Sequence, residues 1–312
     1  YDPACGTGGM LIEVINHVEE TGGNAKTLLG KLYGQEKVLT TSAIAKMNLL
    51  LHGIDDFNIA KGDTLREPAF FTGSRLAQFD CVVANPPFSL KKWGHDQWAD
   101  DKWGRNKLGG VPPTGYADWA WVQHMITSAT PDAGRIAVVL PQGALFRQGA
   151  EAKIRTHVLN AQKVEAVIGL GPNLFYGTGL AACILVLRNQ RDEKQRDQVL
   201  FINGEKLYRR GRNQNTFEPE HAETILTAYR DYEDVENLAK VATIDEIKSN
   251  NYNLNIPLYV QADTGRDEIS LADALARLEA AHERAAQTRA ELENQLAQWG
   301  LSPDHIAKEV SA

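Results

Sequence analysis

Short apolar runs alternate with amphipathic stretches along the first two thirds of the chain. Apolar runs of about four to seven residues between turn residues are typical of buried strands, whereas apolar positions three and four apart indicate helices. Because the two alternate, we expect an α/β fold with an open, doubly wound, mostly parallel sheet of seven strands. Only the end of the first strand is present, before a glycine-rich loop. In addition to the seven strands, residues 198–203 are expected to form an edge strand. The other strands are expected at 32–36, 57–61, 79–84, 135–140, 164–170 and 182–188, and helices at 10–20, 40–52, 116–130 and 218–231.

The C-terminal region has a different hydrophobic pattern. Mostly apolar positions from Leu271 to Trp299 recur at alternating steps of four and three, as in a heptad seam. We therefore expect a heptad helix over 269–300 that forms a coiled-coil arm for subunit assembly. The alternative is an amphipathic helix folded back on its own domain. Residues 1–205 would then form the α/β domain, and residues 206–268 a polar linker or subdomain.

Composition narrows the class of protein. With 312 residues, 43% of them hydrophobic and 23% charged, the chain can form a substantial core. Its apolar runs are far shorter than the about 20 residues that a membrane span needs, and its start does not resemble a signal peptide. Three scattered cysteines suit neither a disulfide framework nor a zinc site. We expect a soluble protein of a reducing compartment, without a membrane partner.

The net charge makes unaided binding to nucleic acid unexpected. Acidic residues outnumber basic ones by 40 to 33, which gives a net charge of −7. Proteins that bind DNA unaided usually have a basic balance, because phosphate neutralisation supplies most of the non-specific affinity. If DNA is the partner, a small basic patch or a second subunit must supply the contacts.

The chain begins with a glycine-rich loop. Residues 2–9 read Asp-Pro-Ala-Cys-Gly-Thr-Gly-Gly and lead directly into a helical stretch. Glycines allow the backbone to come close to a ligand, and the start of the helix offers free N–H groups. Such a loop normally follows a strand, so we expect the chain to be a fragment. A tight turn without a ligand is the alternative, and no Gly-Lys-Ser/Thr follows as in a P-loop.

Two acidic residues follow the next two strands. Glu36 ends the segment Gly34-Gln35-Glu36, where doubly wound folds place a carboxylate that holds ribose hydroxyls. Asp63 follows Gly62 after the third strand, in a position to bind an adenine amine. Each carboxylate alone is more often simply solvated. At successive strand ends that face one crevice, the two support each other as ligands.

The most specific motif is Asn85-Pro86-Pro87-Phe88, directly after a buried strand. It places an amide oxygen, a backbone carbonyl and an aromatic ring on one turn, which the two prolines make rigid. The two oxygens suit a planar substrate with an NH₂ group, and the ring can stack on its plane. A proline-stiffened turn with a capping asparagine is the alternative.

The order of these motifs resembles that of the S-adenosylmethionine-dependent N6-adenine DNA methyltransferases. More narrowly, the chain is similar to the modification (M) subunit of type I restriction–modification systems. The resemblance covers nearly the whole chain. The narrower likeness rests on residues 116–124, 143–147, 173–179, 211–215 and 252–255.

The resemblance implies a Rossmann-like methyltransferase domain that binds S-adenosylmethionine. Glu36 would hold the ribose hydroxyls of this cofactor and Asp63 its adenine. The residues implied on the methionine and ribose side are Asp2, Ala4, Gly6, Thr7, Gly8 and Gly9. No metal is implied.

The resemblance also implies the substrate and the partners. Asn85 and the Pro86 carbonyl would accept hydrogen bonds from N6 of an adenine flipped out of double-stranded DNA, and Phe88 would stack on the base. The implied partners are a specificity (S) subunit and a restriction (R) subunit, in the cytoplasm of a bacterium or archaeon. Related enzymes carry a further cofactor motif and a helical domain upstream, and neither is in this chain.

Other functions compete with this interpretation. A protein-glutamine methyltransferase also uses Asn-Pro-Pro-aromatic, although residues 89–115 and the heptads do not suit it. A cytosine-C5 enzyme would need a cysteine where Asn85 to Pro87 stand; Cys5 is expected to fill a tight site, and Cys81 and Cys183 to lie in the core. A non-catalytic assembly fragment that docks a partner through its C-terminal arm is the alternative from another class.

Residues 89–115 show no clear period, and an irregular stretch of this length is usually functional or mobile. We expect its basic residues to contact DNA. A second basic group, in a polar stretch further on, could contact phosphate or simply be solvated. The first group is Lys91, Lys92, Lys102, Arg105 and Lys107, and the second is Arg209, Arg210 and Arg212.

Overall fold

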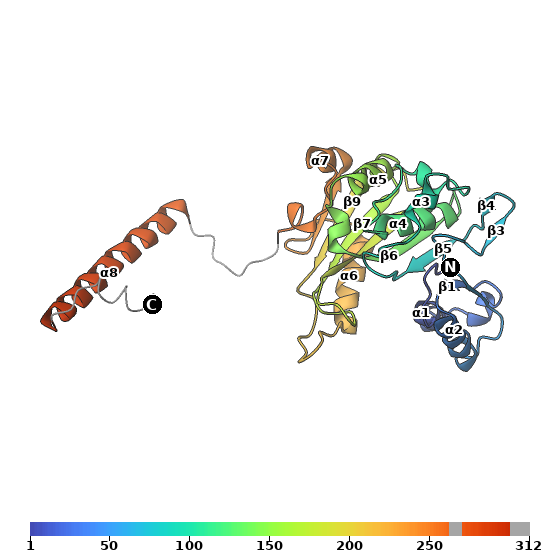
Figure 1. The fold of residues 1–312 in the computed structure, drawn as a ribbon, viewed down its shortest axis with the longest axis horizontal. Coiled ribbons are helices and arrows are strands. Elements are labelled where there is room, and N and C mark those ends of the chain that lie inside the picture. Colours follow the sequence, from blue (N-terminus) through green and yellow to red (C-terminus); the bar gives the residue numbers. More distant parts are fainter. Residues whose placement is uncertain (262–269, 300–312) are drawn as a thin grey trace. The chain divides into compact units, whose positions relative to one another are not determined.

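The computed structural model describes residues 1–261 and 270–299. The chain divides into two compact units, Tyr1–Ala262 and Asp263–Ala312. The first unit holds all the strands of the described residues, and the described part of the second is the helix α8, Leu271–Gln298 (Figure 1).

The main sheet of the first unit has six strands in the order β10-β9-β7-β8-β6-β5. Neighbours β5 and β6 are parallel, as are β7 and β9, whereas β8 is antiparallel to both β6 and β7, and β10 to β9. The main sheet is therefore six-stranded and mixed, whereas the prediction was one sheet of seven mostly parallel strands; the α/β class itself is confirmed. Its strands are β5 (Cys81–Ala84), β6 (Arg135–Pro141), β7 (Val164–Leu170), β8 (Ala182–Arg188), β9 (Gln198–Gly204) and β10 (Ala239–Thr243).

The direction of β8 follows from its connection. A parallel return needs a crossover, usually a helix, whereas an antiparallel neighbour can be reached by a direct loop. Helix α5 (Ala150–Asn160) lies between β6 and β7, but residues 171–181 between β7 and β8 contain no helix. Strand β8 accordingly turns back beside β7 and lies between β7 and β6.

Two strands near the N-terminus form a separate parallel pair, β1 (Tyr33–Glu36) and β2 (Asn58–Lys61). Tyr1 and Asp2 connect this pair to the main sheet. The Asp2 N–H donates to the Tyr33 carbonyl at 2.9 Å, and the Val83 N–H donates to the Tyr1 carbonyl at 2.9 Å. These two residues therefore occupy the position of the expected first strand, between β1 and β5.

The helices expected from the sequence are present with small shifts of their ends. Helices α3, α5 and α7, the hairpin of β3 and β4, and strand β10 were not expected. The bounds are α1 Gly9–Glu20, α2 Leu39–Leu51, α3 His95–Trp98, α4 Asp118–Ser128, α6 Pro219–Asp231, α7 Ile244–Ser249, β3 Phe71–Thr72 and β4 Arg75–Leu76.

Apolar side chains cover both faces of the main sheet. On one face, α4 and α5 pack on β6, β7 and β8, with Trp119, Val138 and Leu185 fully buried (Figure 1). On the other face, α6 packs on β7 and β9, where Ile225 joins the cluster of Ile202. The alternation of inward and outward residues along each strand produces the two layers.

The polar linker or subdomain was expected over 206–268, of which 262–268 lie outside the described residues. Residues 206–261 contain α6, β10 and α7, and they add an edge strand to the main sheet. Helix α8 begins at an N-cap, where the Ser270 side chain accepts a hydrogen bond from the Asp273 N–H at 3.1 Å. The expected C-terminal helix is therefore present. Its pairing as a coiled coil stays a prediction.

Cys5 and Cys183 are buried as expected, but Cys81 is exposed, so its assignment to the core is wrong. Cys81 lines a cavity between the sheet and helix α6, together with Val83 and Ile136 of the sheet and Ile225 of the helix. No helix of the described residues is both long and apolar enough to cross a membrane.

Candidate functional site

The predicted site residues meet at one edge of the sheet. Strands β5, β6, β7 and β9 run in the same direction, so their carboxyl ends share an edge. The turn that starts at Asn85 follows β5 on this edge. Asp2 pairs in parallel with Gly34 of β1, and Glu36 ends that strand. The structure thus brings together the glycine loop, Glu36 and the Asn-Pro-Pro-Phe turn, at the edge where doubly wound sheets bind ligands.

The glycine loop, residues 3–8, is held by close contacts. Gly8 is the N-cap of α1 with a φ of 86°, a conformation that favours glycine. Gly34 lies beneath the loop, where an added Cβ would come within 2.9 Å of Cys5 Sγ. Burial raises the pKa of the Cys5 thiol to about 12, which keeps it protonated and suits a space-filling role. The loop therefore offers no thiolate nucleophile, and the N–H groups of Cys5 and Gly8 stabilise its shape by donating to the Gln35 and Cys5 carbonyls at 3.0 and 2.8 Å.

Two carboxylates line this loop. Glu36 accepts hydrogen bonds from the Gly6 N–H at 3.1 Å and the Val38 N–H at 2.7 Å. Asp2 is 2% exposed and accepts from the Ala4 N–H at 2.9 Å. Burial raises the pKa of Asp2 to about 7, the Ala4 N–H opposes the rise, and Glu36 adds to it. Two carboxylates beside free helix N–H groups suit a ligand with hydroxyl groups and a positive charge.

Asp63 lies in the turn after β2, beside two cations. Lys37 Nζ is 2.9 Å from its carboxylate and Arg66 Nε 3.7 Å. The Asp63 side chain keeps 18% exposure, so one side of it remains accessible. Its predicted contact with an adenine amine stays a prediction.

Three polar residues that hold this region were not identified as such from the sequence. Gln35 is fully buried; its side chain donates to the Glu67 carbonyl at 2.9 Å and accepts from the Ala69 N–H at 2.9 Å. Asn48 of α2 donates to the Thr7 carbonyl at 2.9 Å, and Thr64 donates to the Pro3 carbonyl at 2.6 Å. Their partners are main-chain groups distant in the sequence. Only the position of Gln35 inside a Gly-Gln-Glu segment gave a signal.

The Asn85–Phe88 turn borders a pocket of about 450 Å³. Asn85 and Pro87 are exposed, whereas Pro86 is buried and anchors the turn. The opposite wall comes from the loop after β7, where the Phe175 ring meets the Phe88 ring edge-on, with centroids 5.9 Å apart. The pocket is therefore lined by the Phe88 and Phe175 rings and by the polar Asn85 side chain.

A buried ionic group supports the turn from behind. The Ser89 N–H donates to Asp118 Oδ1 at 2.8 Å, and Asp118 also accepts a hydrogen bond from Arg147. Arg147 donates in addition to Glu151, with Nε 2.5 Å from Oε2, and lies over the Tyr116 ring. Burial is the main influence that raises the pKa of Glu151, while Arg147 opposes the rise. This group fixes the backbone immediately after Phe88.

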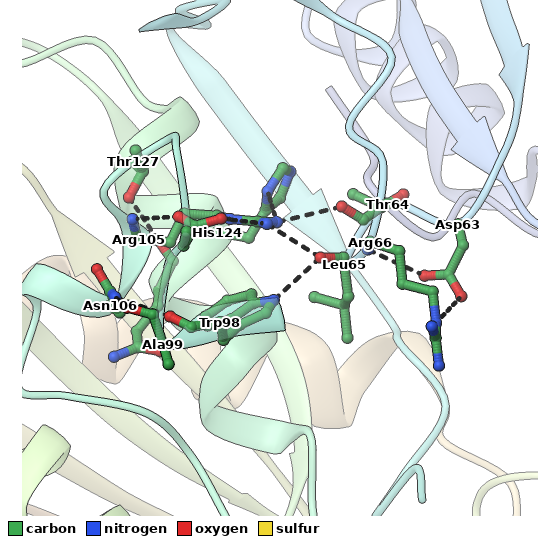
Figure 2. Close-up of polar contacts among 12 residues, drawn as sticks. Asp63, Thr64, Leu65, Arg66, Trp98, Ala99, Arg105, Asn106, His124 and Thr127 are labelled. Carbon is green, nitrogen blue, oxygen red and sulfur yellow. Dashed lines mark hydrogen bonds and ion pairs between the residues drawn. The ribbon is translucent and has the colours of Figure 1, made fainter. Parts of the chain in front are cut away.

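Arg105 anchors the stretch 89–115 on the turn that follows β2. It is 1% exposed, donates to the Leu65 carbonyl at 3.0 Å and lies 2.7 Å from Asp101. Figure 2 shows Trp98 and Arg105 converging on Leu65, beside Asp63. The expectation that Arg105 contacts DNA is therefore wrong, because its guanidinium is buried and bound to Asp101 and the Leu65 carbonyl. The other four basic residues of this stretch, Lys91, Lys92, Lys102 and Lys107, are exposed.

His124 lies behind Arg105. Its Nδ1 is 3.4 Å from Arg105 NH1, and its Nε2 is 3.1 Å from the Tyr1 hydroxyl. Burial, together with the nearby arginine, holds the pKa of His124 well below its usual range. A buried neutral imidazole with protein partners at both ring nitrogens has a structural role. Within residues 1–261 and 270–299, no group of three or more His, Cys, Asp or Glu is arranged to hold a metal.

This fold and this edge of the sheet define an α/β protein of the methyltransferase fold. The crystal structure of a type I restriction–modification methyltransferase subunit from Streptococcus thermophilus matches with a TM-score of 0.75 at 35% sequence identity, over 84% of this chain and 54% of that chain. The EcoKI M protein matches in fold with a TM-score of 0.64 at 21% identity, over 97% of this chain and 69% of that chain.

The chain belongs to the N-6 DNA methylase family, whose model matches residues 1–268. The MjaVII methylase subunit of a type I restriction enzyme from Methanocaldococcus jannaschii is 35% identical over 284 residues, 88% of this chain and 47% of that protein. The HindI methylase subunit from Haemophilus influenzae is 34% identical over 306 residues, 95% of this chain and 66% of that protein. The resemblance to type I modification subunits is confirmed, and the chain spans about half the length of the first curated relatives it matches.

Proposed function

We propose that this chain is the catalytic part of a type I modification subunit, which transfers a methyl group from S-adenosylmethionine to N6 of a flipped adenine in DNA. One observation carries the proposal: the Asn85–Phe88 turn borders a pocket on the same sheet edge as the acid-lined glycine loop. Family membership supports adenine as the base.

The glycine-loop side would hold the cofactor. When bound, S-adenosylmethionine supplies an electrophilic methyl group on a sulfonium. Glu36 is placed to accept hydrogen bonds from the ribose hydroxyls, and the Asp2 carboxylate favours the positive charge of the ligand. Asp63 would bind the cofactor adenine from the turn that Arg105 and Trp98 hold in place. The loop residues Ala4, Gly6, Thr7, Gly8 and Gly9 would approach the ligand through their backbone.

The turn would hold the target base. The N6 amine of adenine is a weak nucleophile, because its lone pair is delocalised into the ring. The Asn85 side-chain oxygen and the Pro86 carbonyl would accept its two hydrogens, favour a pyramidal nitrogen and stabilise the positive charge that develops on it. Phe88 would stack on the base. A base inside a duplex cannot reach the pocket, so flipping is required.

The chain would work with a specificity subunit and a restriction subunit. Its acidic balance suits a protein that leaves much of the DNA contact to a partner. Helix α8 exposes Leu271, Leu275 and Leu278 along one seam, as expected of a helix that docks on another helix. Because DNA is the substrate, we expect it to act in the cytoplasm of a bacterial or archaeal cell.

The test is methyl transfer from labelled S-adenosylmethionine to a duplex, with the label located in the product nucleosides. With the specificity subunit present, we expect N6-methyladenine from the wild-type protein. Asn85→Ala should lower kcat by about 100-fold or more, because it removes an acceptor for the developing charge. The Kd for S-adenosylmethionine should stay within about threefold.

Asn294→Ala, which removes an exposed amide on α8, is the matched control and should behave as wild type. Label on another base, or full activity in the Asn85 variant, would refute the proposed function. If neither the wild-type protein nor any variant transferred a methyl group, although S-adenosylmethionine was bound, the non-catalytic assembly fragment would be favoured instead.

A further inference from the structure

Residues 209–216 form a tight hairpin that the proposed function does not use. The Arg209 N–H donates to the Thr216 carbonyl at 2.8 Å, and the Thr216 N–H donates back at 2.9 Å. At Gly211, an added Cβ would lie 1.9 Å from the Gln214 carbonyl oxygen, so only glycine fits this turn. The Gly-Arg-Asn-Gln-Asn segment therefore encodes a specific backbone shape.

The hairpin binds the rim loop, which we define as residues 172–178. The Gln214 side chain donates to the Leu174 carbonyl at 2.8 Å, and the Asn215 side chain donates to the Pro172 carbonyl at 2.8 Å. In return, the Asn173 side chain donates to the Asn213 carbonyl at 3.0 Å. The Asn215 N–H adds a bond to the Asn173 carbonyl at 2.9 Å. Four hydrogen bonds therefore join two segments that are far apart in the sequence.

The rim loop in turn forms one wall of the pocket beside the Asn85–Phe88 turn. Phe175 contacts Phe88, while the neighbouring Tyr176 is 94% exposed. The hairpin follows β9 and the rim loop follows β7, and these parallel strands end at the same sheet edge as β5. The hairpin consequently stands next to the place where the base would enter.

The hairpin also carries free positive charge. Arg209 pairs with Glu218 at 2.6 Å, but Arg210 and Arg212 are exposed and have no ion pair within the part of the chain that the structure describes. A guanidinium matches the geometry of a phosphate and can bind it through two parallel hydrogen bonds. The chain as a whole has a net charge of −7, so two exposed guanidinium groups at the pocket rim form a local positive patch on an acidic protein.

We propose that the hairpin Arg209–Thr216 is a DNA-contacting element, in which Arg210 and Arg212 bind backbone phosphates of the strand whose base enters the pocket. This inference rests on the proposed function. The side chains of Asn173, Gln214 and Asn215 hold the hairpin on the rim loop. The distance between the phosphate contacts and the Phe175 side of the pocket is therefore fixed. Backbone contacts of this kind position the strand and carry no sequence information.

The test compares two double variants of the full chain with equal loss of charge. Arg210→Gln with Arg212→Gln removes the proposed contacts. Lys194→Gln with Arg196→Gln is the control, because both residues are exposed in the loop between β8 and β9, at the opposite edge of the sheet. Duplex affinity is measured by fluorescence anisotropy at several salt concentrations, and thermal unfolding verifies that all variants are folded.

Each phosphate contact contributes about 0.9 to the slope of log K against log salt concentration. We expect the hairpin variant to lose about 2 from that slope and the control to keep it. In the methyl-transfer assay, the KM for DNA should rise while kcat and the Kd for S-adenosylmethionine change less than about threefold. Equal slopes for wild type and hairpin variant, equal losses in both double variants, or no salt-dependent binding by the wild type would each overturn the inference.

Failure of the proposed function would look different. Duplex binding that depends on Arg210 and Arg212, without N6 methylation of adenine, would leave the hairpin as a DNA contact and remove the assigned chemistry. Methylation that requires Asn85 but not the two arginines would do the reverse.

Discussion

At the scale of single residues, Asp2 combines a buried carboxylate with a proposed ligand role. It lies at the end of the two-residue link between β1 and β5, where water is excluded. Its counterparts in the site, Glu36 and Asp63, have hydrogen-bond or ion-pair partners outside their own strand. The Ala4 N–H and the adjacent N-terminal ammonium stabilise the charge of Asp2, but burial outweighs them, so its ionisation opposes folding.

This predicts a pH-dependent effect of Asp2→Asn on stability. Because the folded pKa of about 7 exceeds the ordinary aspartate pKa of 3.8, the cost of ionisation is absent below about pH 4 and complete above about pH 7. The variant should be more stable than wild type by roughly 2–4 kcal/mol at pH 8, with the difference vanishing toward pH 4. Urea unfolding across this range measures it. Asp55→Asn, at an exposed carboxylate, is the control; parallel pH profiles for wild type and Asp2→Asn would contradict the prediction.

The sequence predicts Glu36 and Asp63 as ligands because each stands at a strand end next to a glycine-containing turn, whereas Asp2 is implied by the family resemblance. It did not identify Asn48 and Thr64 as supports for the glycine loop, since their partners are carbonyls of Thr7 and Pro3. A main-chain carbonyl has no sequence signature, so such contacts are visible only in three dimensions.

At the scale of elements, the stretch 89–115 shows how a segment without periodicity can still be well packed. Trp93 and Trp98 are each 1% exposed, in a cluster with Leu65 from the turn after β2. Arg105 adds hydrogen bonds to the same turn. The absence of a helical or strand period predicted irregular backbone, which the structure confirms except for the short helix α3 and one 3-10 turn at Arg105–Lys107. The buried arginine could not be anticipated, because charged residues are seldom buried.

We therefore predict that Arg105→Met destabilises the protein by about 3–5 kcal/mol. The substitution leaves the Asp101 carboxylate and the Thr64 and Leu65 carbonyls without their donor. Urea unfolding and the rate of proteolytic cleavage within 89–115 report the change. Lys107→Met, at an exposed position of the same stretch, should alter neither. A stable Arg105→Met variant would show that the tryptophans alone hold the stretch.

At the scale of the whole molecule, the chain has two units, and α8 belongs to the second. The seam leucines Leu275, Leu278 and Leu292 are each about half exposed. Their side chains are the feature of α8 that a helical partner would cover. The heptad pattern predicted this helix correctly, but pattern alone cannot distinguish a docking arm from a helix that packs on its own domain.

Substituting Leu275 and Leu278 with serine distinguishes these possibilities. We expect the unfolding free energy of the first unit to change by less than about 0.5 kcal/mol, and binding of the specificity subunit to be lost. Calorimetry and size-exclusion chromatography measure the two quantities. Gln287→Ser with Gln295→Ser, outside the seam, should affect neither. A marked destabilisation of the first unit would support the helix folded back on its own domain.

The sequence by itself determined strands β1, β2 and β5 to β9, helices α1, α2, α4, α6 and α8, the glycine loop, and the place of Asn85–Phe88 after a buried strand. These features depend on neighbouring residues, whose periodicity and turn chemistry are readable along the chain. Tertiary structure alone decided that β8 lies between β6 and β7, that Arg105 is buried, and that the hairpin 209–216 holds the rim of the pocket. Each of these depends on hydrogen bonds and packing between segments distant in sequence, which leave no periodic signal.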